Sequence, residues 1–143
     1  MTALTYSATY HGTSDEIAQE IVQGNVDISV GGGELGQGFY LGDRLHVAKA
    51  WAMQKFGTET VVEFSMADKN FLEFEIEALN RLQAIERRGF IKSLSAQRSF
   101  TFGKDIVWSP IVGGPDVYCD QHKWENRKGQ DYLNGDIVLR RVR

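Results

Sequence analysis

Three short motifs lie within residues 10–51: Tyr10-His11-Gly12-Thr13, Gly36-Gln37-Gly38-Phe39-Tyr40-Leu41 and Ala48-Lys49-Ala50-Trp51. Tyr40 and Trp51 can form two walls of a flat slot, with His11 and the backbone of Gly12 at its mouth. A planar cationic ring gains about 0.5–2 kcal/mol from each aromatic face on which it stacks. The three motifs therefore favour a site for a planar cation that carries an amide, and the nicotinamide ring of NAD has this character.

Each of these residues also has a purely structural interpretation. A single histidine at the end of a strand is more often a packing residue than a catalytic one, and most aromatic side chains belong to the core. Two features favour a ligand instead. Gly12 leaves the backbone open to close approach, and Ala48, one turn before Trp51, leaves space beside the indole ring.

The length and composition predict a single globular domain spanning residues 1–143, with 42% hydrophobic and 24% charged residues. No apolar run approaches the roughly 18 residues needed to cross a bilayer, so we expect no membrane partner. The segment Met1–Thr5 has no basic or apolar character of a secretory signal, so we expect a cytoplasmic protein, with export as an effector still open. The single cysteine, Cys119, excludes an internal disulfide and is expected to be buried and inert.

The charges are unevenly distributed along the chain. Residues 1–80 carry 4 basic and 12 acidic side chains, whereas residues 81–143 carry 12 basic and 7 acidic ones. This asymmetry is typical of two solvated faces, and it also fits a basic surface that meets a phosphate-bearing ligand.

Hydrophobic periodicity predicts an α+β order of elements. We expect a helix capped by Thr13 or Ser14 and ended by Gly24, a helix at Leu45–Phe56, and a helix at Glu75–Arg88 with Ile76, Leu79, Leu82 and Ile85 inward and Gly89 as its stop. The expected strands are Leu4–Tyr10, Phe39–Leu41, Val61–Phe64, Phe71–Phe74, Asp105–Val112, Val117–Trp124 and Asp136–Val142. Gly31–Gly33 reads as a mobile loop, and 31–34 as a flexible lip over the slot.

Several common catalytic motifs are missing from the sequence. Gly36-Gln37-Gly38 does not continue as G-x-G-x-x-G, and it does not follow a clear strand and open a helix, so a dinucleotide-binding Rossmann domain is not expected. There is also no P-loop, no H-E-x-x-H and no G-x-S-x-G. His11, His46 and His122 lack the spacing of metal ligands, so we expect no metal cofactor.

The motifs together resemble the diphtheria-toxin/PARP-like ADP-ribosyltransferases, and most of all a group of small bacterial members. The resemblance rests on His-Gly-Thr, on Gly-x-Gly-Phe-Tyr-Leu followed by a helix with Ala48 and Trp51, and on the later strands at 105–111 and 121–124. It covers the chain from Tyr10 to about Leu133. It implies an ADP-ribosyltransferase-like split β-sandwich with flanking helices and NAD in the cleft.

The resemblance also implies roles for particular residues. His11 would hold the adenosine ribose, Gly12 would pair its backbone with the nicotinamide carboxamide, and Tyr40 and Trp51 would stack on the ring. Ala48 stands where many relatives have a serine or threonine that touches the carboxamide. The remaining residues of the implied NAD site are Thr13, Gly38 and Phe39.

The third catalytic position is occupied by Gln121, where many such enzymes have a glutamate that stabilises the oxocarbenium-like transition state. A glutamine keeps a hydrogen bond to the ribose but brings no charge. At about 4 Å and an effective dielectric of 20, the lost attraction is about 4 kcal/mol, or roughly a thousandfold in rate. Glu125 is the second choice, although in an extended strand it would lie about 13 Å further along. Lys123, Arg127 and Lys128 are either a solvated edge or contacts to a pyrophosphate.

The leading hypothesis is therefore a mono-ADP-ribosyltransferase that cleaves NAD and modifies a macromolecular acceptor, either a protein or a nucleic acid. Its candidate setting is that of a toxin or effector with a neutralising antitoxin or immunity protein. The alternatives are an NAD glycohydrolase, a catalytically weak NAD- or ADP-ribose-binding module of the same fold, and an interaction protein whose aromatic slot is only core.

Overall fold

The computed structural model describes residues 4–113 and 118–143 of the chain. Two sequence-based expectations concern residues outside this range: the absence of a signal at Met1–Thr5 includes residues 1–3, and the expected strand Val117–Trp124 begins at residue 117. Five helices and seven strands make up the described part, which confirms the α+β class. In chain order they are β1 (Tyr6–Gly12), α1 (Asp15–Val22), β2 (Phe39–Gly42), α2 (Leu45–Phe56), β3 (Val61–Ala67), α3 (Asp68–Phe71), β4 (Ile76–Ala78), α4 (Arg81–Ser93), β5 (Ile106–Pro110), β6 (Asp120–Trp124), α5 (Arg127–Leu133) and β7 (Leu139–Val142).

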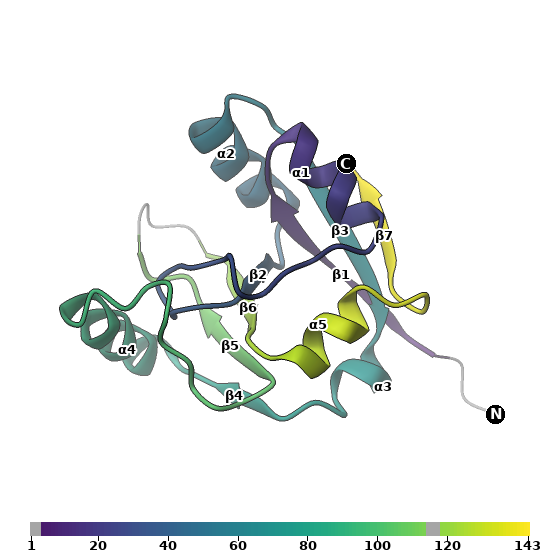
Figure 1. The fold of residues 1–143 in the computed structure, drawn as a ribbon. Coiled ribbons are helices and arrows are strands. Elements are labelled where there is room, and N and C mark those ends of the chain that lie inside the picture. Colours follow the sequence, from purple (N-terminus) through teal and green to yellow (C-terminus); the bar gives the residue numbers. More distant parts are fainter. Residues whose placement is uncertain (1–3, 114–117) are drawn as a thin grey trace.

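The strands form one sheet in the order β4-β5-β6-β2-β1-β3-β7 (Figure 1). All neighbours are antiparallel except β4 and β5, which run parallel. The centre of the sheet is narrow: β1 pairs with β3 from Tyr6 to Gly12, but with β2 only where Tyr10 lies opposite Gly42. We call this single pair the central joint. It divides the sheet into one half made of β1, β3 and β7 and another made of β2, β4, β5 and β6.

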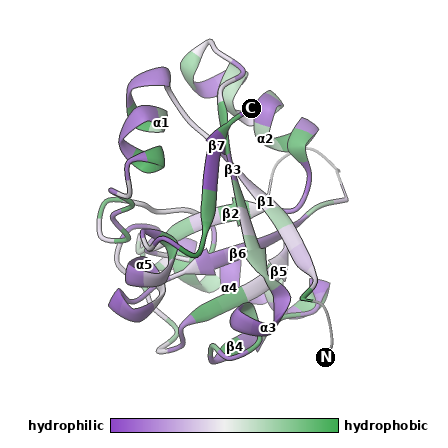
Figure 2. Cartoon of the chain, turned by 90° about the vertical axis from the view of Figure 1, so that its right-hand side faces the viewer, coloured by the Kyte–Doolittle hydropathy of each residue, from purple (hydrophilic) through white to green (hydrophobic). Residues whose placement is uncertain are grey.

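The first two helices lie on opposite faces of the sheet, as Figure 2 shows on either side of β3 and β7. The Ser14 side chain caps α1 by accepting a hydrogen bond from the Ile17 N–H, as the sequence predicts. Helix α2 has the predicted bounds and ends at Gly57, whose φ of 73° is the left-handed conformation typical of a helix C-terminus.

One apolar cluster fills the face of the sheet that α1 and α5 cover. It includes side chains from both halves of the sheet, such as Phe64 of β3 and Phe39 and Trp124 of β2 and β6. The Phe39 ring packs edge-on against Phe64, with ring centroids 5.6 Å apart. Burial of apolar surface on this face therefore holds the halves together where backbone pairing is weakest.

The opposite face of β2 and β6 carries Tyr40, Gln121 and Lys123, because successive side chains of a strand point to alternate faces. Segment 31–38, which we call the glycine segment, covers this face. It is fixed to the segment that follows α4 by backbone hydrogen bonds from Gly33 to Gln97 and from Gln37 to Phe100.

The predictions for residues 71–89 are wrong in two respects. The expected strand Phe71–Phe74 does not form, because Phe71 ends α3 (Asp68–Phe71) and residues 72–74 form a turn. Ile76, expected in a helix, belongs to β4, where it pairs with Ile106 of β5. Helix α4 begins later, after Asn80, which forms a reciprocal capping box with Gln83.

Helix α4 also continues past its predicted stop and turns a different face inward. It runs through Gly89 to Ser93, and its buried residues are Ala84 and Ile91. Leu82 and Ile85, which the sequence places inward, are 67% and 49% exposed. Ala84 and Ile91 are two turns apart and share one face of the helix, and Leu82 and Ile85 lie on other faces.

Helix α5 is absent from the sequence-based expectations. It begins after Asn126, whose side chain accepts a hydrogen bond from the Gly129 N–H. The preceding strand, β6, is shorter than expected, and β7 begins at Leu139 rather than Asp136.

Candidate functional site

His11 lies at the C-terminal end of β1, beside the central joint. Its ring stacks on Phe39 at a centroid distance of 4.3 Å, and its Nδ1 is 2.8 Å from the Tyr40 carbonyl oxygen. A carbonyl oxygen can only accept, so Nδ1 carries the proton. Burial lowers the pKa of His11 from its usual value, which favours the neutral ring. Within residues 4–113 and 118–143 no group bonds Nε2, so this nitrogen offers a lone pair to a hydroxyl donor.

Gly12 is required by the packing of α2. A Cβ atom at this position would lie 2.3 Å from the Ala48 carbonyl oxygen and 3.2 Å from the Ala52 side chain. Both alanines are buried, so the small residue at position 48 serves this contact between helix and strand. The next residue, Thr13, is 2% exposed and donates its N–H to the Thr60 carbonyl oxygen at 3.0 Å.

The Tyr40 hydroxyl fixes the glycine segment. It donates to the Gly36 carbonyl oxygen at 2.6 Å and accepts from the Leu35 N–H at 3.1 Å. Burial raises the pKa of Tyr40, so the hydroxyl stays protonated and keeps its donor role. Gly33 packs against the phenol end of the ring, where an added Cβ would be 2.8 Å from the ring carbon that bears the hydroxyl.

The glycine segment is therefore a packed element of the site, which differs from the mobile lip that the sequence suggests. A Cβ atom added at Gly31 would lie 2.1 Å from the Gly38 carbonyl oxygen. One added at Gly36, where φ is +95°, would lie 2.2 Å from the Phe100 carbonyl oxygen. At Gly38 it would lie 2.5 Å from the Lys123 side chain. These glycines allow close backbone contact with β6 and with the segment after α4.

Trp51 is on the exposed side of α2. Half of its surface is accessible, and its ring contacts are with Phe56, at a centroid distance of 6.5 Å, and with the Lys55 ammonium at 4.7 Å. No ring contact joins Trp51 to Tyr40 in the part of the chain that the structure describes. The two expected walls of the slot are thus on different elements, with the indole open to solvent.

Gln121 lies on β6 opposite Gly42 of β2 and Ser109 of β5, and it is 6% exposed. Its amide nitrogen donates to the Glu34 carboxylate at 2.8 Å. Glu34 also accepts from the N–H groups of Val112 and Gly113, at 3.0 and 2.8 Å. The position expected to carry a catalytic charge therefore holds an amide that is in direct contact with a carboxylate from the glycine segment.

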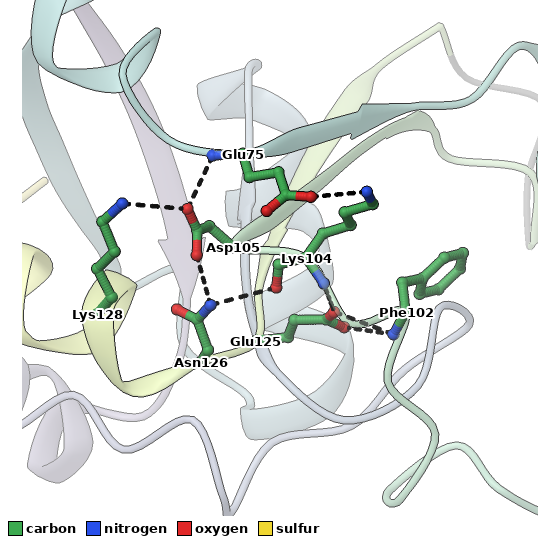
Figure 3. A network of polar contacts seen from close by, with 7 residues as sticks. All are labelled: Glu75, Phe102, Lys104, Asp105, Glu125, Asn126 and Lys128. Atoms are coloured by element: carbon green, nitrogen blue, oxygen red, sulfur yellow. Dashed lines mark hydrogen bonds and ion pairs between the residues drawn. The ribbon is translucent and has the colours of Figure 1, made fainter.

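Glu125 has a different environment from Gln121. Its buried carboxylate pairs with the buried ammonium of Lys123 and accepts hydrogen bonds from the N–H groups of Phe102 and Lys104 (Figure 3). The two hydrogen bonds from Phe102 and Lys104 hold the segment after α4 against the end of β6. Glu125 and Lys123 are therefore engaged with the protein and with each other.

The other two basic residues near this strand are on α5. Lys128 is 3.5 Å from the Asp105 carboxylate, which also accepts from the Asn126 amide and the Glu75 N–H (Figure 3). Arg127 pairs with Asp131 one turn along the helix. Both side chains are largely exposed, which agrees with a solvated edge.

Cys119 is buried, as expected, and donates to the Asp43 carboxylate at 3.2 Å. Burial raises its pKa to about 11, so the thiol is not activated. In the described residues no group of three or more His, Cys, Asp or Glu side chains is arranged to hold a metal ion. None of the described helices is long and apolar enough to span a membrane.

Comparison with models of known protein families and with curated proteins gives no match to this chain. The arrangement of the site residues is thus the main basis for an assignment. The sequence suggests His11, Tyr40 and Gln121, and the structure places them on three neighbouring strands. The side chains of Tyr40 and Gln121 share one face of the sheet, whereas the His11 ring lies on the core face beside Phe39. Glu34 is the residue that sequence reasoning missed, because a single acid in a glycine-rich stretch carries no motif.

Proposed function

We propose that the protein is a mono-ADP-ribosyltransferase that uses NAD. The observation that supports this most is that β1, β2 and β6, which carry His11, Tyr40 and Gln121, are neighbours around the central joint. The His11 ring is on the core face there, and the other two side chains are on the opposite face. His11 is bonded to the Tyr40 backbone. Tyr40 and Gln121 are diagonal neighbours on one face of the sheet, a relation that separates Cα atoms by about 7–8 Å. A sheet whose halves meet at one pair is also compatible with the split β-sandwich of this enzyme class.

Each residue has a step in the proposed reaction. Nε2 of neutral His11 accepts a hydrogen bond from a ribose hydroxyl, and the Tyr40 ring, with Trp51, contacts the nicotinamide. The bond between the ribose C1′ and the nicotinamide nitrogen breaks, and its electron pair neutralises the charge of the ring. The carbonyl oxygen of Gln121 accepts from the 2′-hydroxyl beside the developing cation. A nucleophile of the acceptor then bonds to C1′ and loses its proton.

The test uses NAD labelled in its adenylate part, the purified protein and a bacterial lysate. We expect labelled protein or nucleic acid, and a loss of about a hundredfold in His11→Ala and in Tyr40→Ala, because both residues position the substrate. His46→Ala and Tyr6→Ala are matched controls, since both side chains are exposed. Transfer at the unaltered rate by His11→Ala contradicts the proposal, whereas free ADP-ribose alone indicates a glycohydrolase.

A second candidate is an NAD- or ADP-ribose-binding module, and one observation favours it. The catalytic position carries the uncharged Gln121, so stabilisation of a sugar cation is weaker there than with a carboxylate. Calorimetry that shows NAD binding without turnover would support this candidate. A melting temperature that NAD does not raise would contradict both candidates, because a ligand that binds only the folded state stabilises it.

A further inference from the structure

Glu34 is the one acidic residue of the glycine segment, and its side chain is 14% exposed. Four donors surround its carboxylate: the N–H groups of Val112 and Gly113, the Gln121 amide and the Arg88 guanidinium, whose Nε is 3.5 Å away. Because all four of these groups are donors, the site requires an acceptor on both oxygens. A carboxylate meets this requirement, whereas an amide would turn one donor toward another donor.

The contact with Glu34 fixes the orientation of the Gln121 amide. A carboxylate cannot donate, so the amide nitrogen must face it and the carbonyl oxygen must point away. No group within the described ranges 4–113 and 118–143 donates to this oxygen. The hydrogen bond to a negative charge also polarises the amide and makes the oxygen a better acceptor.

We propose that Glu34 is a positioning residue, which holds Gln121 so that its carbonyl oxygen accepts the 2′-hydroxyl of the nicotinamide ribose. The proposal rests on the proposed function for the identity of the ligand. In this arrangement the negative charge that Gln121 lacks is supplied by Glu34. The Glu34 carboxylate contacts the nitrogen of the Gln121 amide, and the substrate contacts its oxygen. The glycine segment, which also contacts Tyr40, then joins two parts of the site.

The kinetic test is a double-mutant cycle on NAD cleavage, with Glu34→Gln, Gln121→Glu and the double variant that exchanges the two side chains. We expect Glu34→Gln to lower kcat about tenfold with little change in KM, because the interaction is made mainly in the transition state. Gln121→Glu places two carboxylates within hydrogen-bond distance, so one must take up a proton, and its rate should depend on pH. The double variant restores a bond between an amide and a carboxylate, and it should be faster than either single variant. Glu86→Gln is the matched control, since this carboxylate is exposed on α4 and lies outside the contacts of Glu34; its rate should be unchanged.

A second readout does not depend on turnover. The side-chain NH₂ of Gln121, assigned by its loss in Gln121→Glu, should exchange slowly with solvent in the unaltered protein and rapidly in Glu34→Gln. Slow exchange in a protein that does not cleave NAD would overturn the proposed function and leave the positioning role. Unchanged exchange and rate in Glu34→Gln would overturn the positioning role and leave the function. If Glu34→Gln does not fold, rapid exchange in the unaltered protein overturns the proposal, and slow exchange supports it.

Discussion

His122 lies on the core face of β6 between two aromatic rings. Its ring is 4.8 Å from Phe71 and 5.1 Å from Trp108, measured between centroids. Burial lowers the pKa of His122 to about 4, although the carboxylates of Asp43 and Asp120 act in the opposite direction. Protonation of this ring therefore favours the unfolded chain, in which it titrates near its ordinary value.

We predict that His122 makes the stability of the protein depend on pH. The unfolded chain binds a proton near pH 6.5 and the folded chain only near pH 4. The contribution of neutral His122 to the free energy of unfolding is therefore complete above pH 6.5 and is lost as the pH falls toward 4. Between pH 7 and pH 5 the free energy of unfolding should fall by about 2 kcal/mol from this group.

The measurement is urea unfolding at pH 7 and pH 5, with His122→Leu beside the unaltered protein. The variant should lose about 2 kcal/mol less between the two pH values. An equal loss in both proteins would show that other groups cause the pH dependence. Burial also lowers the pKa of His11. Its effect on the pH dependence is the same in the unaltered protein and in His122→Leu, so it cancels in the comparison.

Lys123, on the other face of β6, forms a buried ion pair with Glu125, the residue that follows the end of this strand. Burying both charges is costly, and their attraction and hydrogen bonds offset this cost only in part. The Glu125 carboxylate is stabilised by more than its ion pair, because it also accepts hydrogen bonds from the N–H groups of Phe102 and Lys104. The pair therefore serves to define the path of the segment after α4, against which the glycine segment packs.

At the scale of elements, the contact of α2 with β1 depends on the absence of a side chain at residue 12. We predict that Gly12→Ala lowers the free energy of unfolding by about 1–3 kcal/mol, because the new methyl group meets the backbone of α2. Gly89→Ala is the matched control. Gly89 is exposed within α4 and has open space around it, so the same substitution there should stabilise by about 0.5–1 kcal/mol.

Thermal or urea unfolding of the two variants measures both effects. If Gly12→Ala is as stable as the unaltered protein, the glycine is not required by helix packing. Its role would then have to come from a ligand that approaches the backbone, as the sequence alone suggested.

The comparison of elements shows where sequence reasoning works and where it fails. Helix α2 was predicted with its exact bounds, because a local signal, Gly57, ends it. The prediction of a helix at residues 75–88 was wrong at its start, because Ile76, Leu79, Leu82 and Ile85 have the spacing of one helical face. In the structure Ile76 instead pairs with β5, and such pairing with a distant strand overrides local periodicity.

The candidate site divides in the same way. His11, Tyr40 and Gln121 could be named from motifs, since each stands in a recognisable pattern. The bond between Gln121 and Glu34 joins residues 87 positions apart, and nothing local to either residue encodes it. It depends on the path of the glycine segment over β6, which only the folded chain reveals.

At the scale of the whole molecule, two features of the sheet oppose each other. Backbone pairing joins its halves only at the central joint, but the apolar cluster is continuous across it. Phe39 is the side chain that links them most directly, because its ring contacts His11 of β1 and Phe64 of β3. Since burial of apolar area is the dominant favourable term in folding, we expect the halves to unfold together.

We therefore predict a single cooperative transition in urea, with the same midpoint by tryptophan fluorescence and by far-ultraviolet circular dichroism. Phe39→Ala should lower the free energy of unfolding by about 3–5 kcal/mol, because it leaves a cavity in the shared core. Both probes should shift by the same amount, since the loss is felt by both halves. Two separate midpoints, or a shift seen by only one probe, would mean that the halves are independent units and that the site at the joint is formed by their docking.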